Sequence, residues 1–253
     1  MRKKTIHTLF LLLFCTSYSS YSQSLLQRLQ RLQQVYSQHF TLIDTTQISW
    51  KDGTIMQIDD KKVKTHEQRL AQADIQDQLV QNYPKNPLKN PPQFNEEAGR
   101  IRCEEFFRKM YGNSPKEVEQ KLTTIRWLRK SANIPLKVTT INNVHLHLQA
   151  VSDELEALPK HLHQYFDQPA GTYYWRLIAG TDRLSTHSFG IAIDINVKFS
   201  DYWQWSKPTD KGIPYKNRIP YEIVAIFEKH GFIWGGKWYH YDTMHFEFRP
   251  ELL

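Results

Sequence analysis

Apolar residues near the start of the chain recur at helical spacing. Leu25, Leu29, Leu32 and Tyr36 lie three or four positions apart, which places them on one face of an α-helix. The residues between them are mostly glutamine and arginine. The pattern predicts an amphipathic helix over residues 24–39.

Turn residues mark the next two features. Residues 48–58 hold Lys51-Asp52-Gly53 between apolar runs, which predicts a β-hairpin. Residues 83–99 hold four prolines among asparagine and lysine and therefore predict a long irregular connection. We place a domain boundary here, between an N-terminal helical and hairpin region (23–98) and a second domain (99–253).

The second domain opens with a helix signal. Ser114 is followed by a proline at the first helical position and by Glu117 three residues after the cap, so a helix is expected to run to about Lys130. Residues 137–141 and 144–148, on either side of Asn142-Asn143, predict a hairpin.

The remaining apolar pattern predicts helices and short strands. A further helix is expected at residues 153–158, and short aromatic-rich strands with glycine turns begin near residue 173. Residues 220–230 predict a helix that stops at Gly231. The chain ends in a predicted strand, residues 244–248.

A period of two places a charge on a core strand. In residues 191–196 the isoleucines face one way, whereas Ala192, Asp194 and Asn196 face the other. An unpaired buried carboxylate is costly, so a cation is expected beside Asp194. His187 precedes this strand, and Gly190 lets the chain turn so that the imidazole folds back toward the carboxylate.

The C-terminal strand repeats this design. Its Met and Phe residues form an apolar face, and His245 and Glu247 lie on the opposite one. Two histidines and one aspartate make a three-ligand site for a divalent ion such as zinc, with the fourth position left to water. Asp242, at the entry to this strand, is positioned to take a proton from that water.

The composition of the chain predicts a folded core, and the pattern of its first residues predicts export. The chain has 253 residues, 40% of them hydrophobic, which is ample for a core. Residues 1–22 combine a basic start, a short apolar run and small residues, and so predict a signal peptide cleaved after Ser22. Cys15 suggests a lipoprotein as the alternative, but lipoprotein processing favours a small residue before the cysteine, and Phe14 is bulky.

Removal of the signal changes the charge and the cysteine count. It takes three of the 33 basic residues and none of the 26 acidic ones, which leaves a net charge of +4. Cys103 is then the sole cysteine, so neither an intramolecular disulfide nor a cysteine-rich zinc site is possible. No other stretch has membrane-spanning length, and the scattered basic charge does not favour a nucleic-acid partner.

Two motifs resemble a known family. STHSFGIAID (185–194) and the later Asp242-x-x-His245-Phe246 are similar to the Ser-x-His-x-x-Gly-x-Ala-x-Asp and (Glu/Asp)-x-x-His motifs of VanY-type zinc D-alanyl-D-alanine carboxypeptidases. That family shares its fold with vancomycin-resistance dipeptidases, phage L-alanyl-D-glutamate endopeptidases and the hedgehog domain. The resemblance covers residues 173–250 and implies an α+β fold: a small antiparallel sheet with flanking helices carries the zinc site, and a mixed helical region precedes it.

The resemblance implies roles for individual residues. His187, Asp194 and His245 would be zinc ligands and Asp242 the general base. Family members also stabilise the oxyanion with an upstream arginine, for which Arg176 fits best because it shares a strand face with Tyr174. Arg183 is the alternative.

Further residues are candidates for contact with substrate, each with a structural alternative. Ser185 has a hydroxyl that would bind substrate or form a turn. Trp238 and Tyr239, after Gly235-Gly236, would wall the pocket or pack in the core. His240 is a candidate second proton-transfer group.

The implied function is cleavage of peptidoglycan stem peptides by a secreted zinc peptidase of the periplasm or cell envelope, as a D-alanyl-D-alanine carboxypeptidase. The alternatives are an L-alanyl-D-glutamate-type endopeptidase and a non-catalytic, hedgehog-like zinc-binding recognition module. The sequence contains no nucleophile elbow, phosphate loop or dinucleotide motif, which argues against serine hydrolases and nucleotide enzymes.

Overall fold

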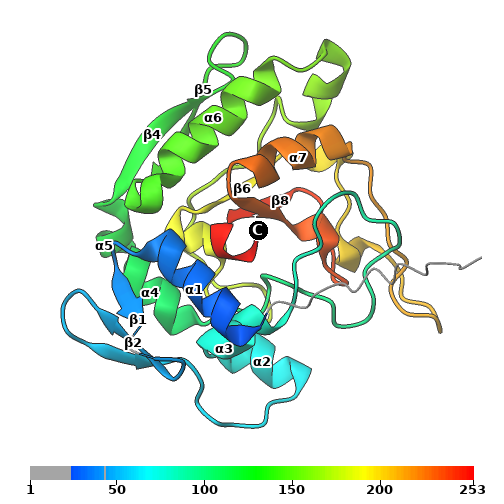
Figure 1. Cartoon of the computed structure of the whole chain (residues 1–253). Helices are drawn as coiled ribbons and strands as arrows, with labels where there is room; N and C mark the ends of the chain where they lie inside the picture. Colours follow the sequence, from blue (N-terminus) through cyan, green and yellow to red (C-terminus); the bar gives the residue numbers. More distant parts are fainter. Residues whose placement is uncertain (1–23, 43) are drawn as a thin grey trace, which may run out of the picture.

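The computed structural model describes residues 24–42 and 44–253, so the predicted signal peptide and Cys15 lie outside the described residues. The chain has an α+β fold with short antiparallel sheets (Figure 1). The helices are α1 (Leu25–Tyr36), α2 (His66–Gln72), α3 (Ile75–Val80), α4 (Glu104–Tyr111), α5 (Pro115–Glu119), α6 (Val144–Glu156) and α7 (Tyr221–Lys229). The strands are β1 (Phe40–Leu42), β2 (Gln47–Trp50), β3 (Ile55–Gln57), β4 (Leu122–Trp127), β5 (Ile134–Thr139), β6 (Ala192–Asp194), β7 (Phe232–Trp234) and β8 (His245–Phe248).

The N-terminal predictions are confirmed. Helix α1 buries Leu29, Leu32 and Tyr36, and Ser24 caps it in a reciprocal pair with Gln27. Strands β2 and β3 form the expected hairpin, and β1 adds a third antiparallel strand. Residues 83–99 contain no helix or strand, as the prolines predict.

The helix expected from Ser114 to Lys130 is wrong beyond its first turn. Ser114 accepts a hydrogen bond from the Glu117 backbone as predicted, but α5 ends at Glu119 and residues 122–127 form β4. The β-branched run that follows α5, Thr123 to Ile125, favours a pleated strand. Pairing with β5 supplies its backbone hydrogen bonds, so a tertiary partner overrides the helix signal.

The hairpin expected at residues 137–148 is also wrong. Strand β5 pairs with β4 instead, and residues 144–156 form the single helix α6. The helix predicted at 153–158 is therefore mostly the last turn of α6. Asn142 and Asn143 both have positive φ, 55° and 57°, but they lead into a helix rather than a two-residue turn. The decisive spacing is that of Val144, Leu148 and Val151, which are all buried on one helical face against β4 and β5.

The C-terminal part carries the sheet that positions the candidate site. Strand β8 lies between β6 and β7, antiparallel to both. Helix α7, which ends before Gly231 as predicted, covers this sheet (Figure 1). Phe227 of α7 stacks on Phe246 of β8 with ring centroids 3.8 Å apart.

The fold class is confirmed as α+β, but the described residues form separate sheets of three, two and three strands rather than one small sheet. Residues on both sides of the predicted boundary at 98–99 belong to one hydrophobic core, which runs from Leu29 to Phe248. The division into domains stays a prediction. Within residues 24–42 and 44–253, no helix is long and apolar enough to cross a membrane.

Gly190 provides a test of the turn that precedes β6. Its φ is +67°, and an added Cβ would lie 2.8 Å from Leu122 Cδ2 and 3.1 Å from the Thr139 nitrogen. Gly180 has a similar φ of +75° but nothing within 4 Å. We expect Gly180→Ala to lose about 1 kcal/mol from backbone strain, and Gly190→Ala to lose about 1–3 kcal/mol more from the clash.

Urea unfolding of the two variants measures this difference. Because both substitutions introduce alanine at positive φ, the unfolding midpoints separate the clash from the strain. Equal losses in the two variants would contradict the role given to the close approach of β5 at Gly190.

Candidate metal centre

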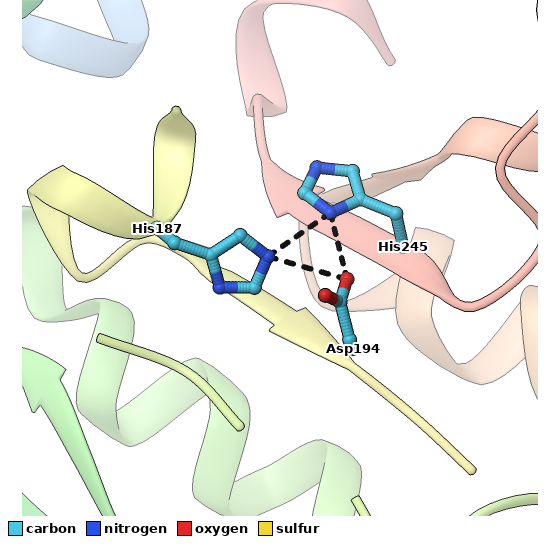
Figure 2. Close-up of side chains that lie close together, drawn as sticks. All are labelled: His187, Asp194 and His245. Atoms are coloured by element: carbon cyan, nitrogen blue, oxygen red, sulfur yellow. Dashed lines mark hydrogen bonds and ion pairs between the residues drawn. The ribbon is translucent and has the colours of Figure 1, made fainter. Parts of the chain in front are cut away.

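Three side-chain atoms converge at the expected position. His187 Nε2, Asp194 Oδ1 and His245 Nδ1 point toward one another (Figure 2). Asp194 Oδ1 is 3.2 Å from His187 Nε2 and 2.9 Å from His245 Nδ1, and the two nitrogens are 3.3 Å apart. The structure therefore brings together the three residues that the motifs single out.

Strand register places two of the three. Asp194 on β6 is directly opposite His245 on β8, and residues opposite each other in an antiparallel pair project from the same face of the sheet. The other face holds Ile193 and Phe246, both fully buried. The period of two that was read from the sequence thus produces this convergence directly.

A short 3₁₀-helix, η3 (Thr186–Phe189), places the third residue. Gly190 ends η3 in the left-handed conformation, as the sequence predicts, and its backbone nitrogen donates to the His187 carbonyl. His187 Nδ1 is 2.5 Å from the Thr172 carbonyl oxygen. Because a carbonyl oxygen only accepts hydrogen bonds, this contact requires the proton to be on Nδ1. The lone pair of Nε2 then faces the cluster.

His245 is oriented by a buried carboxylate. Its Nε2 is 3.2 Å from Glu247 Oε2 and 3.3 Å from Thr186 Oγ1. The Glu247 contact places a proton on Nε2, so Nδ1 is the ring nitrogen that would bind a cation at the cluster. A carboxylate behind a ligating histidine is a common arrangement at zinc sites, where it fixes the ring and raises its basicity.

The geometry fits zinc. Ligand atoms at the usual zinc distances and tetrahedral angles are separated by about 3.3 Å, close to the distances among His187, Asp194 and His245. Two imidazoles and one carboxylate are also a known zinc donor set.

The electrostatics of the cluster favour a cation. Burial lowers the pKa of His245, but Asp194 and Glu247 outweigh it and raise that pKa to about 10. Burial likewise raises the pKa of Asp194, and the two histidines reverse this to well below its usual range. A positive charge is therefore stabilised where the three ligand atoms meet.

Asp242 lies in the same cavity with one carboxylate oxygen unpaired. Its Oδ1 is buried and has no hydrogen-bond partner. Burial, with the nearby charge of Asp194, raises the pKa of Asp242 to about 6. A carboxylate with this pKa near neutral pH is suited to accept and return a proton.

The cavity includes most of the predicted substrate residues. Arg176, Arg183, Ser185, Trp238 and His240 line it together with the three clustered residues. Tyr239 is not among the lining residues: its hydroxyl accepts a hydrogen bond from the Ile213 backbone, and its ring packs on Phe94.

Three of these lining residues also have structural contacts. The Ser185 hydroxyl caps η3 by accepting from the His187 nitrogen. Trp238 donates from Nε1 to the Ala98 carbonyl at 2.7 Å and packs beside His245. His240 contacts Glu97 through Nδ1 and meets Trp203 edge-on.

Sequence reasoning missed several residues of the cavity. Arg100 and Arg102 come from the segment before α4, and Tyr202 and Trp203 come from the loop after β6. No motif or periodicity marks any of them, because their position depends on how distant segments pack. Glu247 was recognised as sharing a strand face with His245, a signal that could have identified its contact with that ring.

A second carboxylate group does not resemble the first. Asp59, Asp60 and Asp74 approach one another near α3. The Lys64 ammonium lies 3.0 Å from carboxylate oxygens of both Asp60 and Asp74. Lysine thus already supplies the positive charge there.

Metal binding can be measured directly. We expect the metal-free protein to take up one equivalent of Zn²⁺, and His245→Ala to lose at least about tenfold in affinity because one of three ligands is gone. His240→Ala is the matched control: it removes a histidine of the same cavity that contacts Glu97 rather than the cluster. Competition with a chromophoric chelator gives the affinities, and equal losses in both variants would contradict the ligand assignment.

Comparison with known proteins agrees with the motifs. Residues 179–248 match a family model described as D-alanyl-D-alanine carboxypeptidase. The matched segment contains His187, Asp194, Asp242 and His245. Neither the comparison with curated proteins nor that with solved structures finds a match. Over residues 179–248, the segment that holds both motifs, the chain is therefore similar to the D-alanyl-D-alanine carboxypeptidase family model.

Proposed function

We propose that this protein is a secreted zinc peptidase that cleaves peptidoglycan stem peptides and acts as a D-alanyl-D-alanine carboxypeptidase. The observation that carries the proposal is the cavity itself. It joins three convergent side-chain atoms to the Asp242 carboxylate, whose buried Oδ1 has no hydrogen-bond partner among the described residues, and all four residues lie within the segment that matches the carboxypeptidase family model. A recognition module would have no need for a poised base.

His187, Asp194 and His245 would hold the metal. When bound, zinc supplies a Lewis acid that polarises the scissile carbonyl and lowers the pKa of water to near neutrality. Asp242 takes the proton from the attacking water and then hands it to the leaving amine. Its raised pKa suits both halves of this transfer, because the carboxylate is ionised at neutral pH yet basic enough to accept a proton.

Arg176 is the proposed oxyanion-stabilising group. It is exposed on the cavity wall, and its guanidinium makes a single long hydrogen bond, 3.4 Å to the Leu177 carbonyl. A guanidinium so weakly engaged can turn toward negative charge that develops on the substrate. Arg183 is less available, since it donates to the Arg100 carbonyl at 2.5 Å.

Export is part of the proposal and is supported by the signal-like pattern of residues 1–22. A location in the periplasm or cell envelope would bring the protein to peptidoglycan. Stem peptides carry free carboxylates, which agrees with the arginines on the cavity wall.

Asp242→Asn tests the base. The amide has the same shape but cannot accept the proton, so turnover is expected to fall about 10²- to 10⁴-fold, while one equivalent of zinc is retained. Asp210→Asn, at an exposed position, is the control and should keep full activity. An Asp242→Asn variant with unchanged kcat would remove Asp242 from the mechanism.

Mass spectrometry of a digested muropeptide mixture tests the reaction. We expect the loss of one alanine from pentapeptide stems, its disappearance on chelation and its return with zinc, because the cluster is the proposed metal site. Cleavage between alanine and glutamate would instead identify an endopeptidase. No product under any condition would favour the recognition module.

A further inference from the structure

Arginines are concentrated on one wall of the metal cavity. Arg100, Arg102, Arg176 and Arg183 all line it. Arg100 forms an ion pair with the buried Glu97. Among the residues that the structure describes, the other three have no carboxylate within 4 Å.

Arg102 is the least compensated of these cations. Only 5% of the residue is exposed, and its Nε is buried with no hydrogen-bond partner. Its one hydrogen bond runs from a terminal nitrogen to the Leu184 carbonyl. A buried charge without an ion-pair partner is costly, so a ligand that supplies the opposite charge would be favoured beside Arg102.

Arg183 adds a second cation beside it. Arg183 donates to the Arg100 carbonyl at 2.5 Å and has no ion-pair partner in the described part of the chain. Burial, and then repulsion by Arg102 and Arg100, lowers the pKa of Arg183 to about 9. The two side chains also line the same cavity, and each donates to backbone near the other residue: Arg102 to the Leu184 carbonyl and Arg183 to the Arg100 carbonyl.

The carboxylates near the cavity do not form ion pairs with Arg102 or Arg183. Asp194 contacts His187 and His245, and Glu247 is engaged with His245 and Arg249. Glu247 and Glu104 attract Arg102 electrostatically, but neither comes within ion-pair distance of it: Glu247 pairs with Arg249, and Glu104 pairs with Arg108. Arg102 and Arg183 therefore have no ion-pair partner among the described residues, and both line the cavity that a substrate would fill.

We propose that Arg102 and Arg183 form a subsite that binds a free carboxylate of the peptide substrate. The proposal rests on the proposed peptidase function and names the chemistry that this cavity recognises. Guanidinium groups bind carboxylates with two parallel hydrogen bonds. The carboxylate has two possible sources in a stem peptide: the C-terminal residue, or the α-carboxylate of a γ-linked glutamate.

The subsite lies next to the metal ligands. Arg102 holds the carbonyl of Leu184, which directly precedes the first motif, and Glu104 accepts from the Leu184 nitrogen at 2.7 Å. A carboxylate bound there is thus anchored to the same segment that carries His187. The region before α4, which lies outside the family match, would then contribute to specificity.

Binding of two matched peptide pairs tests the subsite. The first pair is N-acetyl-D-alanyl-D-alanine and its C-terminal amide. The second pair consists of γ-D-glutamyl peptides with amidated C-termini, one with a free glutamate α-carboxylate and one with the α-amide. Calorimetry is done on zinc-loaded Asp242→Asn, which prevents turnover, and on metal-free wild type, which removes direct binding of carboxylate to zinc.

We expect the acid of at least one pair to bind about 10- to 100-fold more tightly than its amide. Arg102→Gln and Arg183→Gln should each remove most of that preference. Arg183 is only partly buried, so its variant remains informative if Arg102→Gln fails to fold. The matched control is Arg126→Gln, which changes the net charge equally at an exposed position on β4 and should leave the preference intact.

Each outcome decides the proposal. A preference in the first pair assigns the subsite to the terminal carboxylate, and a preference in the second assigns it to glutamate. Equal binding of acids and amides, or a preference that survives both arginine substitutions, overturns the subsite. Muropeptide cleavage is measured separately, so an inactive protein with an arginine-dependent preference would refute the peptidase function while the subsite stands.

Discussion

The rest of the structure depends on the ion pairs that the buried Arg249 guanidinium forms with two glutamates. Arg249 is fully buried and forms ion pairs with Glu247 and Glu251, while one nitrogen also donates to the Gly99 carbonyl. Glu247 continues to His245, and Glu251 accepts from the Tyr36 hydroxyl at 2.7 Å. This chain of contacts connects His245 of the candidate metal centre to the first helix, and removal of one ion-pair partner would leave an uncompensated charge in the core.

This network gives the N-terminal region a direct connection to the site. Helix α1 packs beside the C-terminal 3₁₀-helix η7 (Pro250–Leu252) (Figure 1). Gly99 is held by Arg249, and the segment that follows it supplies Arg100 and Arg102 to the cavity. Two of the four arginines on the cavity wall therefore come from a part of the chain far from the three clustered residues.

Predictions from the sequence were correct where an element depends on contacts between near neighbours in the chain, and they were wrong where it depends on a distant partner. The helix of residues 25–36 was predictable because its cap and its apolar face are local. Residues 122–127 were mistaken for helix because their strand conformation depends on β5, a partner that a local cap signal does not reveal. Tyr239 was expected in the pocket as the neighbour of Trp238, yet it turns toward Ile213, since adjacent residues in an extended chain point to opposite sides.

The sequence by itself predicted which residues form the centre. A period of two in two strands, a turn-forming glycine and the spacing of the motifs are local properties that place His187, Asp194, His245 and Asp242 together, and the resemblance of the motifs to a known family implies their roles. Only the tertiary structure decided what surrounds them. Arg102, Glu247 and the Thr172 carbonyl acquire their roles by packing against groups far away in sequence, and burial, which sets the cost of each unpaired charge, exists only in the folded chain.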